Sequence, residues 1–521
     1  MTRPVRLTSR HPCRPASGRL TGRAIRAAAL AAVASLVAAS FGGAADWPMG
    51  GRAGDRNPVS PEATAPADWE FGSETLKPRN VRWNVPVGTS CRAMGGPVVS
   101  GGLVWVGTVE YDPGRVDRPT LACYRERDGV LVYQYKSDRL PNRLAEWRGH
   151  SLTGSPMAEG DRLWFVTNRR EVVCLDTGLL RLGTGDARVV WKLDMVDRLK
   201  VSPSWVHTSW PDEHGSPVGY GEFLYVPTGN AVTNDGGRLS INAPAAPSLV
   251  CLRKSTGEVV WSDNSPGPVL LTGHRASPLV AEISGRVLVI HPQGDGWVRA
   301  FEALTGKLVW KFDVNPKTAV GDRVFSEAGR VGVFGTPVFA GGRVFLATGV
   351  NPESVGEPGR LFCLDPMRFG DVSSTLVIDS VKERPNPNSA VVWEFASAGP
   401  AEGDRMHQSL GSVAVHSGLV FAADTYGFVH CLDAKTGRQQ WSHNCKAAVF
   451  GNPLVAGGHL YVADNAGVTW VLDAKATGRV HGRFEADRSV FAGPVFANGT
   501  LYILTERRLY AIGTNPVERP K

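Results

Sequence analysis

The sequence lacks the short motifs that mark several common catalytic and metal-binding proteins. It has no Cys-x-x-Cys pair, which excludes a zinc ribbon and a covalently attached c-type haem. It also has no P-loop, no Gly-x-Ser-x-Gly elbow, no His-Glu-x-x-His motif and no EF-hand loop. No long amphipathic helix is evident. The organisation of the chain therefore has to be inferred from its internal repetition.

Acidic residues are missing from the N-terminus, where much of the excess positive charge is found. The formal net charge is +8, and residues 1–45 contain seven arginines and no acid, so the rest carries only about +1. Binding of nucleic acid through bulk positive charge is therefore not expected.

An apolar stretch of 15 residues, Ala27–Phe41, follows these arginines and leads into Gly-Gly-Ala-Ala. A basic region, a short apolar stretch and small residues predict a secretory signal peptide over residues 1–45, cleaved near Ala45. The stretch is short for a membrane span, although an uncleaved anchor remains the alternative. We expect export to the periplasm or the extracellular space, with no membrane span in the mature chain.

Two sequence markers recur along the chain with a period of about 40 to 60 residues, which indicates a propeller or a solenoid. The first is a Gly/Ser-Pro type turn before an apolar run, and it occurs eight times: at Gly96, Gly154, Gly215, Ser277, Gly335, Gly411, Gly451 and Gly493. The second is a cassette of a small residue, a glycine and an aromatic residue, clearest from Cys431 to Trp441. Each unit reads as four antiparallel strands, which is one propeller blade.

The cassettes vary in how closely they match. Gapless copies run over Cys251–Trp261, Ala300–Trp310 and Cys123–Tyr133. Looser copies cover Cys174–Trp191 and Cys363–Trp393, and the copy beginning at Val471 has one extra residue before Gly478 and ends at Phe484.

These markers predict an all-β protein, a single eight-bladed propeller of four-stranded antiparallel blades. The eighth unit, Phe491–Gly513, supplies three strands, and the strand Asn80–Pro86 is expected to complete it and close the ring. An open solenoid is the alternative. The predicted organisation is a signal peptide over 1–45, an N-terminal extension over 46–79, the propeller over 80–513 and a tail over 514–521.

Five cysteines occupy one repeat position, and we expect them to be small buried residues beneath the neighbouring aromatic residue. They are Cys123, Cys174, Cys251, Cys363 and Cys431. Equivalent strands of different blades are too far apart for disulfides. Cys91 and Cys445 are left over, and either free thiols or a disulfide between them is compatible with the sequence.

The pattern small-x-Asp-x-x-Thr-Gly-x-x-x-Trp resembles the tryptophan-docking motif of the pyrroloquinoline quinone (PQQ) enzyme repeat. In addition, Asp46-Trp47-Pro48-Met49 resembles the opening of secreted PQQ-like propellers of planctomycete-type bacteria. The aromatic residue is expected to stack on the adjacent blade, and the cassette aspartates Asp176, Asp433 and Asp473 to face their own turns. The docking positions are Trp83, Tyr133, Trp191, Trp261, Trp310, Trp393, Trp441 and Phe484.

The resemblance to quinoprotein dehydrogenases implies a possible cofactor site at the mouth of the central channel. Such enzymes hold PQQ against a Ca²⁺ bound by Glu, Asn and often Asp, with an Asp as general base. Many alcohol-oxidising members also have two adjacent cysteines against the cofactor, and this sequence has no such pair.

Candidate channel-mouth residues lie in loops that break the repeat. They are Arg148, His150, His207, Asp212, Glu213, His214, His274, Arg275, Asp295 and His407. Together they suggest a polar funnel that tolerates anions. Each could instead be an ordinary polar loop residue, and for Asp295 the alternative is a local Asx-type bond.

Two insertions, residues 226–247 and 366–390, interrupt blades three and five, and long loops on a rigid ring are where propellers place recognition. We therefore expect a non-catalytic scaffold that binds other proteins of the cell envelope through these loops. It is expected to be a monomer that needs no cofactor and no metal. The alternative is a dehydrogenase that uses PQQ and Ca²⁺ to oxidise an alcohol or a sugar.

Overall fold

The structure is a computed structural model that divides the chain into two units, Met1–Phe41 and Gly42–Lys521. Everything below concerns the second unit. The described residues are 45–72, 76–88, 91, 93–110, 118–138, 152, 154–202, 215–230, 232–235, 238–241, 243–269, 276–317, 319, 330, 332–349, 358–379 and 382–513.

Eight antiparallel sheets, each with an inner, two middle and an outer strand, follow one another along the chain. Blades one to four are β2 (Val98–Ser100), β3 (Leu103–Glu110), β4 (Arg118–Arg125), β5 (Leu131–Lys136); β6 (Met157–Glu159), β7 (Arg162–Val166), β8 (Glu171–Asp176), β9 (Arg188–Asp194); β10 (Val218–Tyr220), β11 (Phe223–Pro227), β14 (Leu249–Arg253), β15 (Val259–Asp263); and β16 (Leu279–Ile283), β17 (Arg286–Pro292), β18 (Trp297–Glu302), β19 (Leu308–Asp313).

Blades five to eight continue the same order. They are β20 (Val338–Ala340), β21 (Arg343–Ala347), β22 (Leu361–Leu364), β26 (Val391–Phe395); β27 (Ala414–His416), β28 (Leu419–Ala423), β29 (Phe428–Asp433), β30 (Gln439–Asn444); β31 (Leu454–Ala456), β32 (His459–Ala463), β33 (Val468–Asp473), β34 (Val480–Glu485); and β35 (Val495–Ala497), β36 (Thr500–Leu504), β37 (Arg508–Ile512), β1 (Val81–Pro86). The predicted eight-bladed propeller is confirmed.

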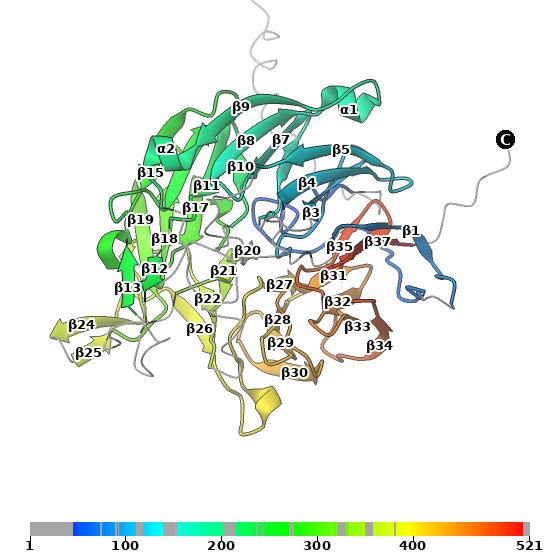
Figure 1. Cartoon of the computed structure of the whole chain (residues 1–521). Helices are drawn as coiled ribbons and strands as arrows, with labels where there is room; N and C mark the ends of the chain where they lie inside the picture. The colour runs from blue at the N-terminus through cyan, green and yellow to red at the C-terminus, as the bar shows by residue number, and fades with distance from the viewer. Residues whose placement is uncertain are drawn as a thin grey trace, which may run out of the picture. The chain divides into compact units, whose positions relative to one another are not determined.

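The predicted closure of the ring is also confirmed. The strand β1 pairs antiparallel with β37, with Trp83 opposite Ala511 and Val85 opposite Leu509. Figure 1 shows β1, in blue, beside β37, in red. The last three strands of the chain thus obtain their outer partner from the N-terminal side, so the outer edge of β37 is covered.

Short elements are added to this ring outside the repeat. They are the helices α1 (Gly178–Leu182) and α2 (Met195–Leu199), the hairpin of β12 (Val232–Asp235) and β13 (Arg238–Ile241), the strand β23 (Gly370–Asp371), and the hairpin of β24 (Thr375–Asp379) and β25 (Lys382–Pro385). The first hairpin lies in the insertion of blade three and the second in that of blade five, as the sequence placed them. The strand β23 pairs in parallel with β19, so the insertion of blade five adds a fifth strand to blade four.

The docking tryptophans hold neighbouring blades together. In blade five, Nε1 of Trp393 donates a hydrogen bond to the carbonyl of Ala434 in blade six at 3.0 Å. The same indole lies against the cassette glycine Gly437 of that blade. Equivalent Nε1 bonds to the next blade are made by Trp83, Trp191, Trp261, Trp310 and Trp441.

The prediction that Phe484 occupies the docking position of blade seven is wrong. Gly482 lies opposite Val471 there, where blade six has Trp441 opposite Cys431, and the ring of Phe484, two residues further on, lies over Gly482.

The N-terminal extension adds aromatic side chains at this blade. Trp69 is buried and stacks on Phe484 with ring centroids 3.8 Å apart. Phe71, two residues further on, packs edge-to-face against Tyr510 of blade eight at 4.7 Å. Aromatic contact across the junction of blades seven and eight is therefore supplied in part by a segment more than 400 residues away in the sequence.

The five repeat cysteines lie where the sequence predicted. Each is buried, and its strand partner is the docking aromatic residue of its own blade, as in Cys431 opposite Trp441. The same register holds for Cys123, Cys174, Cys251 and Cys363. Cys91 and Cys445 are both buried as thiols, so the disulfide between them that the sequence left open is not formed.

Replacing Gly437 with alanine should destabilise the protein by about 1–3 kcal/mol. Gly437 has φ +72°, and an added Cβ would lie 2.7 Å from Cδ2 of Trp393, so strain and a steric clash add together. Gly458 is the matched control, because it has φ +80° but nothing within 4 Å of its Cβ position. Urea midpoints measured by tryptophan fluorescence should rank wild type, Gly458→Ala and Gly437→Ala in falling order. Equal midpoints for the two variants would mean that the docked indole imposes no constraint.

Candidate functional site

The central channel is occupied by residues 45–62, which we call the plug. The inner strands of a propeller present free edges to the channel, and the plug pairs with them. Trp47 exchanges two backbone hydrogen bonds with Val99 of β2, at 2.9 Å each. Further along the plug, Val280 of β16 donates to the carbonyl of Gly54 at 2.8 Å.

The other blades are bound in the same way as the plug passes around the ring. Its partners are Ala158, Phe339, Val415, Val455 and Asn498 in blades two, five, six, seven and eight. Arg56 supplies the bonds to blade three. The sequence predicted an N-terminal extension over residues 46–79, and the structure shows that the plug is hydrogen-bonded to every blade.

Arg56 is the central side chain of the plug. It is 1 % exposed, and its guanidinium donates to the carbonyls of Gly50, Ser216, Pro217 and Pro278 at 2.7 to 3.0 Å. Burial lowers its pKa to about 9, which still leaves it protonated at neutral pH. One fixed cation thus joins the plug to blades three and four.

The Gly-Ser/Thr-Pro markers form a ring of hydrogen bonds between blades. The backbone N–H of Ser155 donates to Oγ of Ser216 at 2.9 Å, and that of Ser216 donates to Oγ of Ser277 at 2.8 Å. The series continues from Ser277 to Thr336, and an equivalent bond joins Ser412 to Asn452. The markers therefore tie each of these blades to the next, besides making turns.

A cavity of about 120 Å³ lies between this ring and the plug. Its lining includes Gly50 and Arg56 of the plug and the ring residues Ser155, Ser216 and Ser412. Oγ of Ser412 is buried without a hydrogen-bond partner, so this polar cavity has room and partners for water.

The described residues around this cavity do not fit PQQ with Ca²⁺. Ligand pockets usually measure about 300–1,000 Å³, and Ca²⁺ is bound by six to eight oxygens that include carboxylates. No aspartate or glutamate is among the described lining residues, and the charged one, Arg56, already has four acceptors. We derive no chemical step through this cofactor, and the expectation that the protein needs none stays a prediction.

Most of the predicted channel-mouth residues cannot be placed. Arg148, His150, His207, Asp212, Glu213, His214, His274 and Arg275 lie outside the described residues. Asp295 and His407 are described, and the structure puts them in separate polar networks, on blades four and six.

His407 belongs to a buried network with two carboxylates. Its Nδ1 and the Nε2 of His430 both donate to Oδ2 of Asp424, at 3.0 and 3.1 Å. Nε2 of His407 reaches the more exposed Glu402 at 3.2 Å. The hydrogen bond that Nδ1 of His407 donates to Asp424 raises the pKa of His407 above its usual value, although burial lowers it.

Asp424 is fully buried and accepts bonds from more than the histidines. The backbone N–H groups of Tyr426 and Phe428 donate to its Oδ1 at 3.0 and 2.8 Å. Burial alone would raise its pKa, but the hydrogen bonds from His407 and His430 outweigh it and lower the pKa to about 2. The two histidines around this carboxylate fasten the entry of blade six, and none of the three residues is among the described lining of the cavity.

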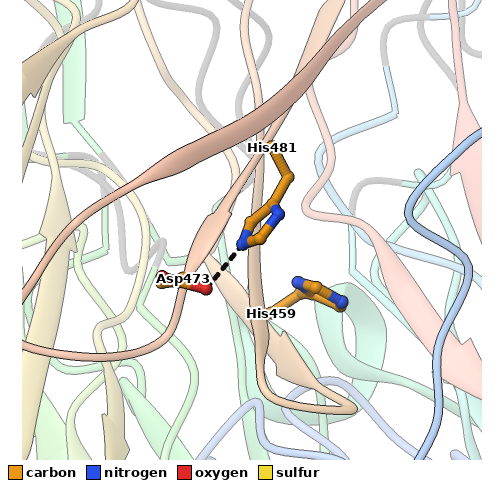
Figure 2. A group of neighbouring side chains, drawn as sticks. All are labelled: His459, Asp473 and His481. Atoms are coloured by element: carbon orange, nitrogen blue, oxygen red, sulfur yellow. Dashed lines mark hydrogen bonds and ion pairs between the residues drawn. The ribbon is translucent and has the colours of Figure 1, made fainter.

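Two further polar clusters contain none of the described residues that line the cavity. Figure 2 shows the first, formed by His459, Asp473 and His481 in blade seven. In the sequence Asp473 was expected to face its own turn; it does accept from Oγ1 of Thr477 at 3.3 Å, but it also bonds to Nε2 of His481 at 2.5 Å. The turn contacts predicted for Asp176 and Asp433 are present.

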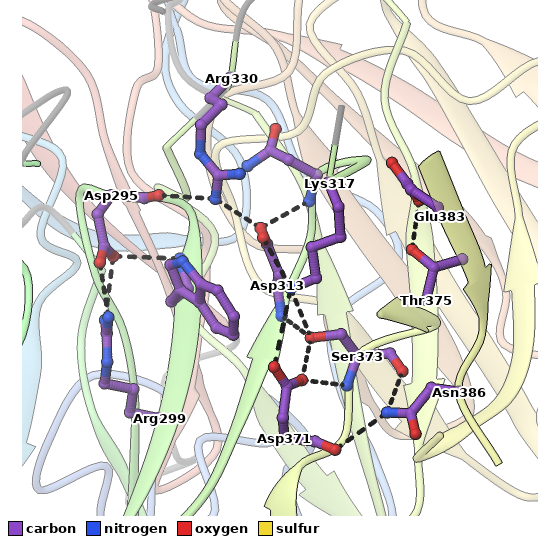
Figure 3. Close-up of polar contacts among 12 residues, drawn as sticks. Asp295, Arg299, Asp313, Lys317, Arg330, Asp371, Ser373, Thr375, Glu383 and Asn386 are labelled. Carbon is purple, nitrogen blue, oxygen red and sulfur yellow. Dashed lines mark hydrogen bonds and ion pairs between the residues drawn. The ribbon is translucent and has the colours of Figure 1, made fainter. Parts of the chain in front are cut away.

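Asp295 lies in the second cluster, shown in Figure 3. It is 2 % exposed, accepts from both Nη atoms of Arg299 at 3.0 and 2.7 Å, and makes the predicted Asx-type bond with the N–H of Trp297. Arg330 bridges the carbonyl of Asp295 and the carboxylate of Asp313. The carboxylate of Asp295 is thus fully paired, by Arg299, which favours a structural role for Asp295.

The same network anchors the insertion of blade five. Oγ of Ser373 accepts from the N–H of Asp313 at 3.0 Å and donates to Oδ1 of Asp371 at 2.6 Å. Nδ2 of Asn386 donates to the carbonyls of Asp371 and Ser373, which closes the base of the insertion. Lys317 joins Asp313 and Ser373 and lies 3.9 Å from the centre of the Trp297 ring. The hairpin β24–β25 thus projects from a rigid base (Figure 1).

Sequence reasoning missed Arg56, Asp424, His430 and the cluster in blade seven. For Asp424 a signal existed, because the same turn position carries Asp464 in blade seven, and both accept the N–H two and four residues later. For Arg56 no local pattern pointed to burial, because its long-range partners belong to blades three and four, which are distant from the plug in the sequence.

These observations define a class: an eight-bladed propeller whose channel is filled by its own N-terminal segment. A family model described as outer membrane protein assembly factor BamB matches residues 147–379 and 377–512. The chain belongs to this family. No curated protein matches the sequence.

Three solved structures are similar to this chain, and the first of them supports the fold. BamB from Moraxella catarrhalis is similar with a TM-score of 0.52 at 15% identity, over 83% of this chain and 99% of that chain. A europium-containing methanol dehydrogenase gives a TM-score of 0.43 at 12% identity, over 88% and 89%. Quinohemoprotein alcohol dehydrogenase from Comamonas testosteroni gives 0.44 at 12% identity, over 91% and 82%. At these identities the likeness concerns architecture.

In the described part of the chain, helices are short, and none is long and apolar enough to cross a membrane. The predicted signal peptide falls almost wholly outside the described residues.

Proposed function

We propose that this protein is a non-catalytic scaffold of the cell envelope that binds another protein through the insertion of blade five. The observation that carries the proposal is an anchored insertion that exposes large apolar side chains, two before β23 and two in the hairpin. Met367, Phe369, Val377 and Ile378 are each 52 to 59 % exposed within a stretch of twelve residues. Exposed apolar groups concentrated in this way are typical of a protein interaction site.

The hairpin also offers backbone groups to a partner. Among the described residues β24 and β25 pair only with each other, so each has a free edge. A free edge can accept an extended segment as an additional strand, with apolar side chains giving further affinity. The base of the insertion already illustrates this mode, because β23 adds to the outer edge of blade four. We propose that the partner docks such a segment on β24–β25.

The filled channel supports the same proposal. The plug satisfies the inner strand edges with the chain's own backbone, and the remaining cavity is small and without carboxylates among its described lining residues. The membership of the BamB family is compatible with an assembly role in the envelope. An exported chain would meet its partner there.

A photo-crosslinking amino acid at Val377, in cells of the native host, should give an adduct with one defined protein. The matched control is Leu304, which is 62 % exposed but lies in a cassette turn of blade four. The purified partner should bind the wild-type protein and lose about 1–3 kcal/mol of binding free energy with Val377→Asp, without a change in thermal midpoint. Equal crosslinking at both positions would contradict the assignment of this surface.

The enzymatic alternative is tested separately. The purified protein, supplied with PQQ and Ca²⁺, should reduce no dye with a panel of alcohols and aldoses. Substrate-dependent dye reduction would overturn the scaffold proposal, whatever the crosslinking shows.

A further inference from the structure

Three neighbouring strands of blade seven bring two histidines and an aspartate together. His459 begins β32, Asp473 ends β33 and His481 lies in β34. One potential ligand atom from each side chain lies within 4.8 Å of those of the other two (Figure 2). The rings of the two histidines meet edge to face with centroids 4.9 Å apart.

The strand register explains why these side chains meet. His459 and Asp473 are direct partners across β32 and β33 and therefore lie on the same face. Across β33 and β34, Val471 faces Gly482 while Leu472 faces Val480, so His481 is the extra residue of a β-bulge. A bulge redirects a side chain, and here it directs His481 towards Asp473.

Other blades have the same bulge but different side chains at the three positions. In blades two and five the position of His459 carries Arg162 and Arg343, which form ion pairs with Asp176 and Asp365. The bulge residue in blades two, three and five is valine: Val190, Val260 and Val392. Blade seven thus replaces a cation and an apolar residue by two imidazoles around the same carboxylate.

The extra residue in the cassette of blade seven changes the role of the carboxylate. In blade six, Asp433 accepts the N–H groups of Lys435 and Thr436 and the hydroxyl of Thr436, all within the turn. Asp473 accepts from the hydroxyl of Thr477 and from Nε2 of His481. Lengthening the turn therefore leaves this carboxylate available to groups outside the turn.

His459 provides a second sign of a ligand. Its Nδ1 is buried and has no hydrogen-bond partner in the structure. Buried side-chain nitrogens are nearly always satisfied by protein, water or an ion. An unprotonated imidazole nitrogen that makes no hydrogen bond can donate its lone pair to a transition-metal ion.

We propose that His459, Asp473 and His481 bind a divalent transition-metal ion, with Zn²⁺ the best fit. Imidazole suits such ions, and a site with three protein ligands leaves a fourth position for water. Tetrahedral ligands at the usual Zn²⁺ distances lie about 3.4 Å apart, which small side-chain rotations can reach from the present spacing. The ion takes the place of the proton between His481 and Asp473, and the partly exposed His481 gives it access from solvent. The bound ion would fasten three strands of one blade together.

The full chain, purified without a histidine tag and treated with a chelator, is titrated with ZnCl₂ by calorimetry and with CoCl₂ by visible absorption. One equivalent of Zn²⁺ should bind, and Co²⁺ should give the intense absorption of a tetrahedral site. His481→Ala should weaken binding by roughly 100-fold or more, since loss of an outer-shell group alone costs 10- to 100-fold. Asp473→Asn should act in the same direction.

Asp433→Asn is the matched control, because it removes the equivalent carboxylate of blade six and should leave the affinity for Zn²⁺ unchanged. Urea midpoints without metal establish that each variant is folded, and added Zn²⁺ should raise the midpoint of the wild type and not that of His481→Ala. No saturable binding by the folded wild type, or binding that His481→Ala leaves intact, would overturn the proposal.

Discussion

Replacing Arg56 with alanine is expected to lower the free energy of unfolding by about 3–5 kcal/mol. Arg56 is 1 % exposed, and four carbonyls that it now satisfies would be left without a donor inside the channel. Buried acceptors that lose their donor cost their full desolvation penalty. Urea denaturation followed by tryptophan fluorescence measures the loss. Limited proteolysis should also cleave the variant faster within residues 45–62, because the plug loses the hydrogen bonds of Arg56 to blade three and one of its bonds to blade four.

Two further variants distinguish the contribution of the Arg56 hydrogen bonds to stability from the contribution of its charge. Arg56→Lys keeps the charge but cannot reach carbonyls in several directions at once, so it should fall between wild type and alanine. Arg125→Ala removes an arginine that is 37 % exposed and pairs with Asp128, and should cost less than about 1 kcal/mol. If Arg56→Ala and Arg125→Ala unfold at the same urea concentration, the plug is not held by Arg56.

Replacing Asp424 with alanine is expected to cost a similar amount, about 3–5 kcal/mol. The change removes the acceptor of His407 and His430 and leaves both imidazoles buried without it. It also frees two backbone N–H groups in the turn before β29. Asp424→Asn keeps the size and one acceptor oxygen, and should recover part of the loss. A change below about 1 kcal/mol for the alanine variant would contradict the network.

The contribution of Asp424 should depend on pH in a defined direction. Its pKa falls from 3.8 to about 2 on folding, so the folded state favours the carboxylate. That contribution, about 2 kcal/mol, is fully present above pH 4 and is lost as the pH falls towards 2. The pKa of His407 is raised above 6.5, so its contribution is complete below pH 6.5 and is lost as the pH rises through the folded value.

The difference in unfolding free energy between wild type and Asp424→Ala should therefore be largest between about pH 4 and pH 6.5. Urea titrations at pH 2.5, 5.5 and 9 test this. A difference that stays constant over this range would mean that neither group titrates as the contacts imply. His407→Gln should abolish the decline on the alkaline side alone.

The blade count and the ring closure could be predicted because they follow from local patterns repeated many times. A turn, a hairpin and a docking tryptophan each need only neighbouring residues and one adjacent blade, as Trp393 over Gly437 illustrates. The candidate site was less predictable. The sequence singled out His407 and Asp295 as candidate channel-mouth residues, with an ordinary polar loop residue as the alternative for each. The structure places them in separate networks, whose members Asp424 and Arg330 lie 17 and 35 residues away along the chain.

The amino-acid sequence by itself determined the eight-bladed propeller, the strand that closes it and the places of the cysteines and docking tryptophans. Each of these needs contacts within one blade or between adjacent blades, which leave a periodic trace in the sequence. Only the tertiary structure revealed the plug and Arg56, because their partners lie up to about 450 residues away, on or beside the inner strands of all blades. The cluster of His459, Asp473 and His481 likewise required the bulge, because strand register, and not spacing along the chain, decides which side chains meet.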